Sequence, residues 1–412
     1  MRGRLRALAA SSFTAFVGTA AFRVSIPAVA YYVREELSGA MAEVGLLTSA
    51  FFTARAAAAL LAGRALEAGA RTALLASLCF AVNAVVAQLY MLSSTWLAAS
   101  LLKLVQGILN GLAWVFIQYA LGLSVEARLR GRAYSVYFAM GSLGSMMGNV
   151  IYSILGEGGM WKALTASSLL FVATAVTAAM VPEPPTARRV KAKRSSPPPA
   201  TGVGGLNIQV LTAIASMRAA SALIGGDLIY VYLREACGAS RQAVALVVGL
   251  CDVAGIAASF AISWVADRGR DLAAMALASV SALSGGVLFA VRSPPTLLAG
   301  YALFAIGARS LTPLTRRVAT TYAEMKGMAV GAVNAVGNFS TALSSPLIGG
   351  LLDVLDYQTV NVAGVEILVA MAVIDLVIAA GACIPLILLA KLSSSQLASR
   401  EYASRRSGAL ST

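Results

Sequence analysis

Charged side chains lie inside long apolar runs of this sequence. Such a residue costs several kcal/mol or more if it faces lipid, so each should face a polar interior, pair with an opposite charge, or mark a pathway. A carboxyl group in such a place can carry a proton, and a group of cations attracts an anion. The charged residues concerned are Arg23, Arg55, Lys103, Arg218 and Arg309, and the acids Asp227, Asp252 and Asp375.

The run 96–121 carries further polar residues at helical spacing. At about 100° per residue, one stripe falls within an arc of about 120°. It consists of Lys103, Gln106, Asn110, Trp114 and Gln118. A polar stripe inside an apolar helix predicts a water-filled cavity or polar neighbours.

The composition indicates a membrane protein. Of the 412 residues, 58% are hydrophobic and 12% charged, whereas soluble domains are about 45–50% apolar and about 25% charged. The apolar surplus must therefore face lipid. This excludes a cytosolic enzyme, a disordered scaffold and a secreted disulfide module.

Several chemistries are also excluded by residues that the chain lacks. It has no histidine, its four cysteines show no metal-binding spacing, and it contains no Gly-Lys dipeptide of a phosphate-binding loop. The net charge of +14 is spread in short bursts between apolar runs, so no nucleic acid partner is expected. We predict no catalytic residues, no metal and no cofactor.

Twelve apolar runs are long enough to cross a bilayer as helices, which takes about 20 residues each. They are 8–32, 44–62, 73–92, 96–121, 134–155, 163–181, 207–233, 243–264, 272–291, 296–314, 329–352 and 367–390. With the N-terminus inside, the cytoplasmic segments hold 22 of the 32 Lys and Arg residues and the outside loops hold five. This asymmetry predicts a multi-pass protein of the cell membrane with both termini in the cytoplasm.

The chain is predicted to consist of two related halves. A basic, proline-rich segment, 182–206, separates a six-helix bundle at 1–181 from a second at 207–391, and a cytoplasmic tail follows at 392–412. The motif Tyr-x-Arg-Glu at 32–35 recurs at 232–235. An even number of spans per copy gives both halves the same orientation. The predicted fold is therefore an all-α integral membrane protein whose twelve transmembrane helices form two pseudo-two-fold-related six-helix bundles.

Two short loops carry a similar motif. The loop after the second span carries Gly63, Glu67 and Arg71. The loop after the eighth span carries Asp267, Arg268 and Arg270. These loops resemble the Gly-x-x-x-Asp-Arg-x-Gly-Arg signature of the major facilitator superfamily of secondary transporters, although Ala68, Ala70 and Ser263 depart from it. The resemblance covers nearly the whole chain and implies the superfamily fold. A carboxylate there can hold arginines and helix N-terminal amides, which would form a cytoplasmic gate. The alternative is that each loop is only a tight turn whose basic residues set the orientation of the protein in the membrane.

The resemblance also suggests where a solute would bind. In the superfamily the first, fourth, seventh and tenth spans line a central cavity, and these spans carry four of the five intramembrane cations. We therefore expect the protein to bind a small anionic organic solute, together with a proton or a counter-anion. We expect it to be a monomer in the lipid bilayer. The expected binding residues are Arg23, Lys103, Gln106, Asn110, Trp114, Arg218 and Arg309. The proton-coupling candidates are Asp227, Asp252 and Lys103.

Alternatives remain open. Some of these cations could form structural ion pairs with the acids, and Arg55 is the foremost candidate for that role. Lys103-Leu-Val-Gln106-Gly107 is similar to the Arg-x-x-Gln-Gly motif of proton-coupled members. A proton-coupled exporter of hydrophobic compounds is thus a second candidate function. A non-transporting sensor is a remote third.

Overall fold

The computed structural model describes residues 2–67, 69–126, 130–155, 159–183, 215–219, 221–322 and 326–408. Within these ranges the side chains of 2–4, 130–132, 315–334, 392–408 and a few further positions, Glu67 among them, are not described. Most of the predicted linker 182–206, the start of the predicted second bundle at 207–214 and residues 409–412 of the predicted tail lie outside the described residues.

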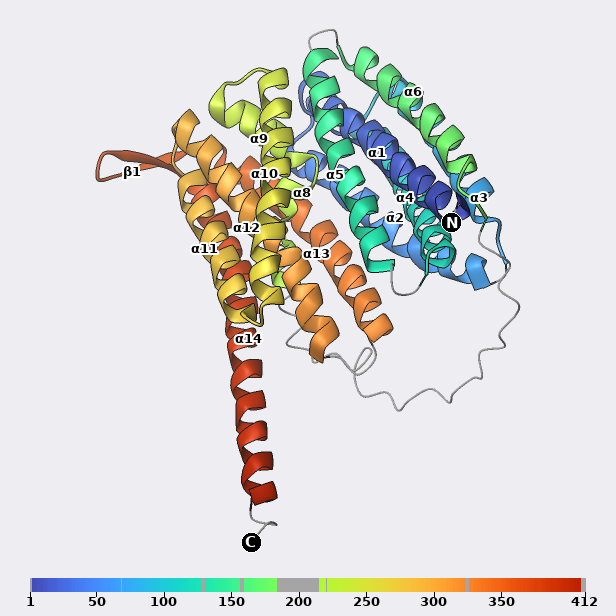
Figure 1. The fold of residues 1–412 in the computed structure, drawn as a ribbon. Helices are drawn as coiled ribbons and strands as arrows, with labels where there is room; N and C mark the ends of the chain where they lie inside the picture. The colour runs from blue at the N-terminus through green and yellow to red at the C-terminus, as the bar shows by residue number, and fades with distance from the viewer. Residues whose placement is uncertain are drawn as a thin grey trace.

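The apolar runs of the first half form long helices that cross the molecule alternately up and down (Figure 1). Short turns, η1 (Tyr32–Glu36) and η2 (Tyr90–Leu92), follow α1 and α3. The helices are α1 (Arg2–Tyr31), α2 (Met41–Glu67), α3 (Thr72–Leu89), α4 (Trp96–Ser124), α5 (Arg130–Leu155) and α6 (Met160–Ala179).

The described part of the second half repeats this pattern, except that its seventh span is interrupted. The seventh span is broken between α8 (Ala222–Gly225) and α9 (Leu228–Cys237), where the Gly225-Gly226 pair predicts unwinding. The other helices are α10 (Arg241–Asp267), α11 (Asp271–Phe289), α12 (Pro294–Tyr322), α13 (Lys326–Leu355) and α14 (Val369–Gly408).

Ten helices among the described residues are long and apolar enough to span a membrane, and they coincide with ten of the twelve predicted spans. The broken seventh span and α13 complete the set. A feature absent from the prediction is an antiparallel hairpin of β1 (Thr359–Val362) and β2 (Val365–Leu368). Its tight turn places Ala363 and Gly364 at positive φ. The last span therefore begins at Val369 rather than at 367.

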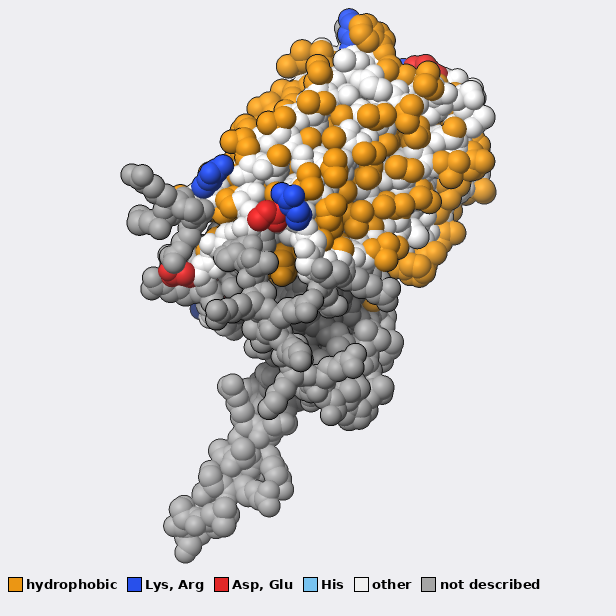
Figure 2. Space-filling view, turned by 90° about the vertical axis from the view of Figure 1, so that its right-hand side faces the viewer, with side chains coloured by type: hydrophobic (Ala, Val, Ile, Leu, Met, Phe, Trp, Pro, Cys, Tyr) orange, Lys and Arg blue, Asp and Glu red, His pale blue; other side chains and the backbone are white. Residues whose placement is uncertain are grey.

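Apolar side chains cover the outer faces of the helices. Figure 2 shows one such face, on which hydrophobic side chains dominate and the few charges lie toward its edges. The exposed hydrophobic side chains on α3 and α6 are Leu74, Leu78, Val82, Val85, Leu169, Val172 and Val176. This surface suits lipid rather than water.

The two halves pack together at one end of the molecule, which we name the closed end. It comprises residues 31–45, 228–245 and 345–357. There α2 packs on α13 and α5 on α10, and the backbones come so close that only glycine fits at some positions. A Cβ atom at Gly45 would lie 2.5 Å from the Ser345 carbonyl oxygen, and one at Gly349 would lie 2.3 Å from that of Met41. We name the opposite end, at residues 67–72 and 267–271, the linker end.

Candidate functional site

A cavity of about 410 Å³ lies between the two halves. Its walls come mainly from α1, α2, α4 and α5, and the second half contributes Gly226, Asp227, Ile256 and Arg309. On α4 the lining extends from Lys103 to Gln118, about 22 Å along the helix axis at 1.5 Å per residue. The cavity thus continues from below the closed end toward the linker end.

Most of the predicted binding residues meet in this cavity. Its lining includes Arg23, Lys103, Gln106, Asn110, Trp114 and Arg309, together with Gln118 of the predicted stripe. The remaining candidate, Arg218, lies against Gly337 of α13, where a Cβ atom would be 3.2 Å from Arg218 Cγ. It is not among the residues that line the described cavity, so its role in binding stays a prediction.

Asp252 on α10 is shared by two arginines from opposite halves. Arg23 Nη2 lies 3.4 Å from Asp252 Oδ2, and Arg309 Nη2 donates to Asp252 Oδ1. Ser145 Oγ of α5 donates to Oδ2 at 3.2 Å. The aspartate side chain is 3% exposed, against 14% for Arg23 and 30% for Arg309. The arginines therefore face the cavity with the carboxylate behind them.

Lys103 and Asp227 form a second ion pair across the halves. Lys103 Nζ donates to Asp227 Oδ1 at 2.7 Å, and Thr48 Oγ1 of α2 donates to Oδ2 at 2.8 Å. The break between α8 and α9 makes this possible, because the Asp227 amide then donates to Thr48 Oγ1 at 2.9 Å. A Cβ atom at Gly226 would lie 2.3 Å from that oxygen, so the approach requires glycine.

Several polar atoms of the cavity wall lack a protein partner within the described part of the chain. They are Gln106 Nε2, Asn110 Oδ1 and Arg309 Nε. Tyr90 donates to Gln106 Oε1 at 3.3 Å and so orients that amide. Buried polar atoms are rarely left unsatisfied, so these groups are available to a polar solute or to water.

The structure adds cavity residues that the sequence did not assign to solute binding. Arg55, expected to be structural, lines the cavity with Thr48, Phe51 and Phe52. Their spacing of i, i+3, i+4 and i+7 places them on one face of α2, which was the available signal. The cations Arg23, Lys103 and Arg309 line the cavity and are also paired with acids, so the expected ion pairing is present. Their role in solute binding stays a prediction.

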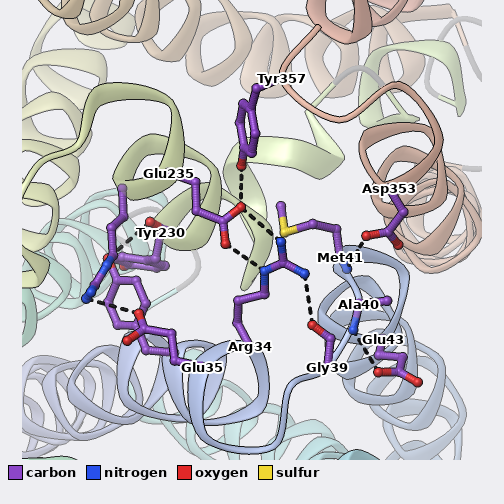
Figure 3. Close-up of polar contacts among 12 residues, drawn as sticks. Arg34, Glu35, Gly39, Ala40, Met41, Glu43, Tyr230, Glu235, Asp353 and Tyr357 are labelled. Carbon is purple, nitrogen blue, oxygen red and sulfur yellow. Dashed lines mark hydrogen bonds and ion pairs between the residues drawn. The ribbon is translucent and has the colours of Figure 1, made fainter.

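At the closed end, the repeated Tyr-x-Arg-Glu motif joins the halves reciprocally (Figure 3). Arg34 of the first copy binds Glu235 of the second through Nε at 2.6 Å and Nη2 at 3.1 Å. Arg234 of the second copy binds Glu35 of the first at 3.0 Å, and Arg241 also contacts Glu35. The same motif thus contributes a cation and an anion from each side, as at a two-fold interface.

Further contacts strengthen the closed end. Tyr357 donates to Glu235 Oε2 at 2.6 Å. Burial raises the pKa of the Tyr357 phenol above its usual range, so it remains a donor. Asp353 at the end of α13 accepts the amides of Met41 and Ala42 at 2.7 and 2.8 Å. These amides open α2, where a carboxylate is favoured by the helix dipole.

At the linker end, the predicted gate residues lie on or beside short turns. Gly63 has open space around its Cα, Arg71 is exposed before α3, and Asp267, Arg268 and Arg270 are exposed. The Glu67 side chain lies outside the described residues. The carboxylate that holds a helix N-terminus here is Glu183, which accepts the amides of Thr72 at 2.9 Å and Ala73 at 3.0 Å. The gate role of the predicted residues stays a prediction.

No group of three or more Cys, Asp or Glu side chains among the described residues is placed to hold a metal ion. The cavity is lined by cations, a carboxylate, amides and aromatic rings. Such a set can bind and release a solute reversibly.

Comparison with solved structures shows the same fold in several transporters. The nucleoside transporter NupG matches with a TM-score of 0.69 and 14% identity over 94% of this chain and 98% of that chain. The human organic anion transporter MFSD10 matches with a TM-score of 0.67 and 17% identity over 94% of this chain and 99% of that chain. A D-xylose-proton symporter matches with a TM-score of 0.67 and 13% identity over 92% of this chain and 97% of that chain. No curated protein matches the sequence.

The sequence itself matches the family model of the Major Facilitator Superfamily twice, over residues 11–226 and 210–382. The two matches overlap at 210–226 and together cover both halves of the chain. The chain therefore belongs to the Major Facilitator Superfamily of transporters.

Proposed function

We propose that this protein is a secondary transporter that moves a small anionic organic solute by alternating access. The observation that carries the proposal is the charge of the site: four cations surround the cavity, against two carboxylates. These are Arg23, Arg55, Lys103 and Arg309, against Asp227 and Asp252. An excess of positive charge in a partly enclosed site favours an anion.

The remaining wall supports an organic body for this anion. Phe22, Phe51 and Trp114 supply aromatic surface, and Gln106 and Asn110 supply unpaired amide atoms. Pockets of this kind bind small molecules through apolar walls and a few polar groups. The solved structures with this fold include transporters of nucleosides, an organic anion and a sugar, which supports a small-molecule solute.

The closed end supports alternating access. Contacts between the halves seal one end, while the cavity continues toward the other, and the charge asymmetry of the loops favours a cytoplasmic linker end. In this orientation the protein lies in the cell membrane with both termini in the cytoplasm, and the conformation seen here faces the cytoplasm. Because each half is a bundle of its own, rocking one half against the other would exchange the open end.

Binding measurements on the purified protein test the anion assignment. We expect benzoate or gluconate to raise the melting temperature, and their neutral counterparts benzamide and glucose to leave it unchanged. Tetraphenylphosphonium represents the substrates of the alternative, a proton-coupled exporter of hydrophobic compounds. Stabilisation by this cation, with none by the anions, would favour that alternative.

The Arg23→Ala variant tests the site itself. Hydrogen bonds to charged groups contribute about 1.5–3 kcal/mol, so the variant should weaken anion binding about ten- to a hundredfold. Arg292→Ala is the matched control, because Arg292 is exposed and pairs with Glu366 of the hairpin at 3.7 Å. Equal anion affinity in both variants would remove the anion site from this cavity.

A further inference from the structure

The Asp252 side chain offers Arg23 and Arg309 a carboxylate, which is the group that an organic acid would also offer them. We propose that the carboxylate of a monoanionic solute replaces Asp252 between these two arginines, and that Asp252 takes up one proton when it is displaced. This inference rests on the proposed function and adds to it the solute's charged group, the coupling ion and the residue that carries the proton.

The geometry places the aspartate in an exchangeable position. Arg23 comes from α1 of the first half, Arg309 from α12 of the second, and both line the cavity while Asp252 lies behind them. Arg309 Nε is buried without a partner in the described structure, so this guanidinium already has a spare donor. Guanidinium groups bind carboxylates through paired donors, so a solute carboxylate can compete for the same atoms.

Displacement leaves Asp252 in surroundings that cannot stabilise its charge. The groups that face it are the two arginines, Ser145 of α5, Tyr230 of α9, Tyr301 of α12 and its neighbour Cys251. Without the arginines, the groups that face Asp252 from the described residues are neutral hydroxyls and a thiol, and its side chain is 3% exposed. A buried carboxylate that has lost its partners takes up a proton rather than remain charged.

The exchange balances in atoms and in charge. One proton from the aqueous side forms an O–H bond on Asp252, one anion enters, and no covalent bond of the solute changes. The arginine pair faces one carboxylate before and after the exchange. Solute and proton would then cross together without net charge, and release of the proton would let Asp252 expel the solute.

Asp227 is the other acid at the cavity, and its contacts favour a permanent pair. Its carboxylate is held by both Lys103 and Thr48, and its amide is held by Thr48. The side chains of Lys103 and Asp227 are 3% and 4% exposed, so neither guides an entering solute as Arg309 can. We therefore place the proton on Asp252.

Proton uptake during binding tests the inference directly. Full-length protein in weakly buffered solution at neutral pH, with a pH indicator, is titrated with benzoate and, separately, with benzamide. We expect uptake of about one proton per benzoate bound, and a dissociation constant that rises about tenfold for each unit of pH increase. Asp252→Asn mimics the protonated residue, so it should bind benzoate without proton uptake and without this pH dependence.

The matched control is Asp375→Asn, which removes a partly buried acid on α14 that does not line the cavity. It should keep the uptake of one proton. Benzoate binding to the wild type without proton uptake, or uptake that persists in Asp252→Asn, would overturn the inference and leave the anion site standing. Absence of binding by benzoate and gluconate alike would overturn the proposed function itself. The wild-type titration decides the matter even if Asp252→Asn does not fold.

Discussion

Individual charged residues connect the two halves of this protein inside the membrane. Lys103 reaches Asp227 from the first half, and Arg23 reaches Asp252 in the same way. A charge in the hydrocarbon region is tolerated when it is paired and hydrogen-bonded, and it becomes costly when its partner is removed. Removal of one partner from such a pair should therefore destabilise the fold.

Removal of one member of the Lys103–Asp227 pair should reveal this cost. In Lys103→Met, Asp227 keeps Thr48 but loses its cation, and we expect a loss of about 3–5 kcal/mol in the free energy of unfolding. Denaturant-induced unfolding in detergent measures it. The control Lys162→Met removes an exposed lysine that lies over the Trp161 ring, and it should change stability by less than about 1 kcal/mol. Equal effects of the two substitutions would show that the buried pair is not a stabilising unit.

The sequence identifies which charges lie in the membrane, but it cannot assign their partners. Arg23 corresponds to Leu223 in the second copy, so no symmetry rule joins it to Asp252. Arg55 was expected to be structural because its span is not among the cavity helices of the superfamily. The partner of Arg23 depends on how the bundles dock, which helical periodicity within one bundle does not determine. The place of Arg55 on the cavity face of α2 does follow from its spacing to Thr48, Phe51 and Phe52.

At the scale of elements, the end of α1 and the end of α9 meet through copies of one motif. The Arg34–Glu235 and Arg234–Glu35 pairs hold these ends together, and Tyr357 and Asp353 add contacts from the segment after α13 and from its last turn. The side chains of both pairs are between 24% and 33% exposed, so water still reaches them. Such pairs can break and reform during transport.

Charge reversal should open the closed end and a double reversal should restore it. Arg34→Glu and Glu235→Arg each place like charges together, which is unfavourable, whereas the double variant regains an opposite pair. Spin labels at positions 92 and 360, both exposed at this end on opposite halves, should move apart in the single variants only. Arg292→Glu disrupts an exposed pair within the second half and should leave the distance unchanged. A double variant that stays as open as the single variants would contradict this role.

The contact of α2 with α13 offers a steric test of the same closure. Gly349→Ala places a Cβ atom 2.3 Å from the Met41 carbonyl oxygen, whereas the neighbouring Gly350 has nothing within 4 Å. We expect the first substitution to lengthen the distance between positions 92 and 360, and the second to have no effect. Identical distances in the two variants would mean that the closed end does not depend on this packing.

The helices themselves follow from the sequence because apolar length determines them. The break in the seventh span was also foreseeable, since two adjacent glycines weaken a helix. The β1–β2 hairpin was missed because its strands are short and lie beside the last apolar run. The role of Glu183 was missed for another reason: this residue caps α3 although it follows α6, and only the folded bundle brings these helices together.

At the scale of the whole molecule, the duplicated halves contribute unequally. The first half supplies most of the cavity wall, including its aromatic and amide groups, whereas the second supplies Asp227 and Arg309, with Asp252 behind Arg309. The repeat has remained symmetric at the closed end, where the halves exchange identical motifs. The symmetric closed end and the unlike cavity walls are compatible with the proposed alternating access.

Counterflow in proteoliposomes tests whether this cavity carries an anion across the membrane. Vesicles that contain purified protein are loaded with unlabelled benzoate or gluconate and diluted into a trace of the same compound in radiolabelled form. We predict transient accumulation of the label above equilibrium, which is absent from vesicles that carry Arg23→Ala and from protein-free vesicles. Equal uptake in all three preparations, with either anion and under an imposed pH gradient, would contradict transport of an anion through this site.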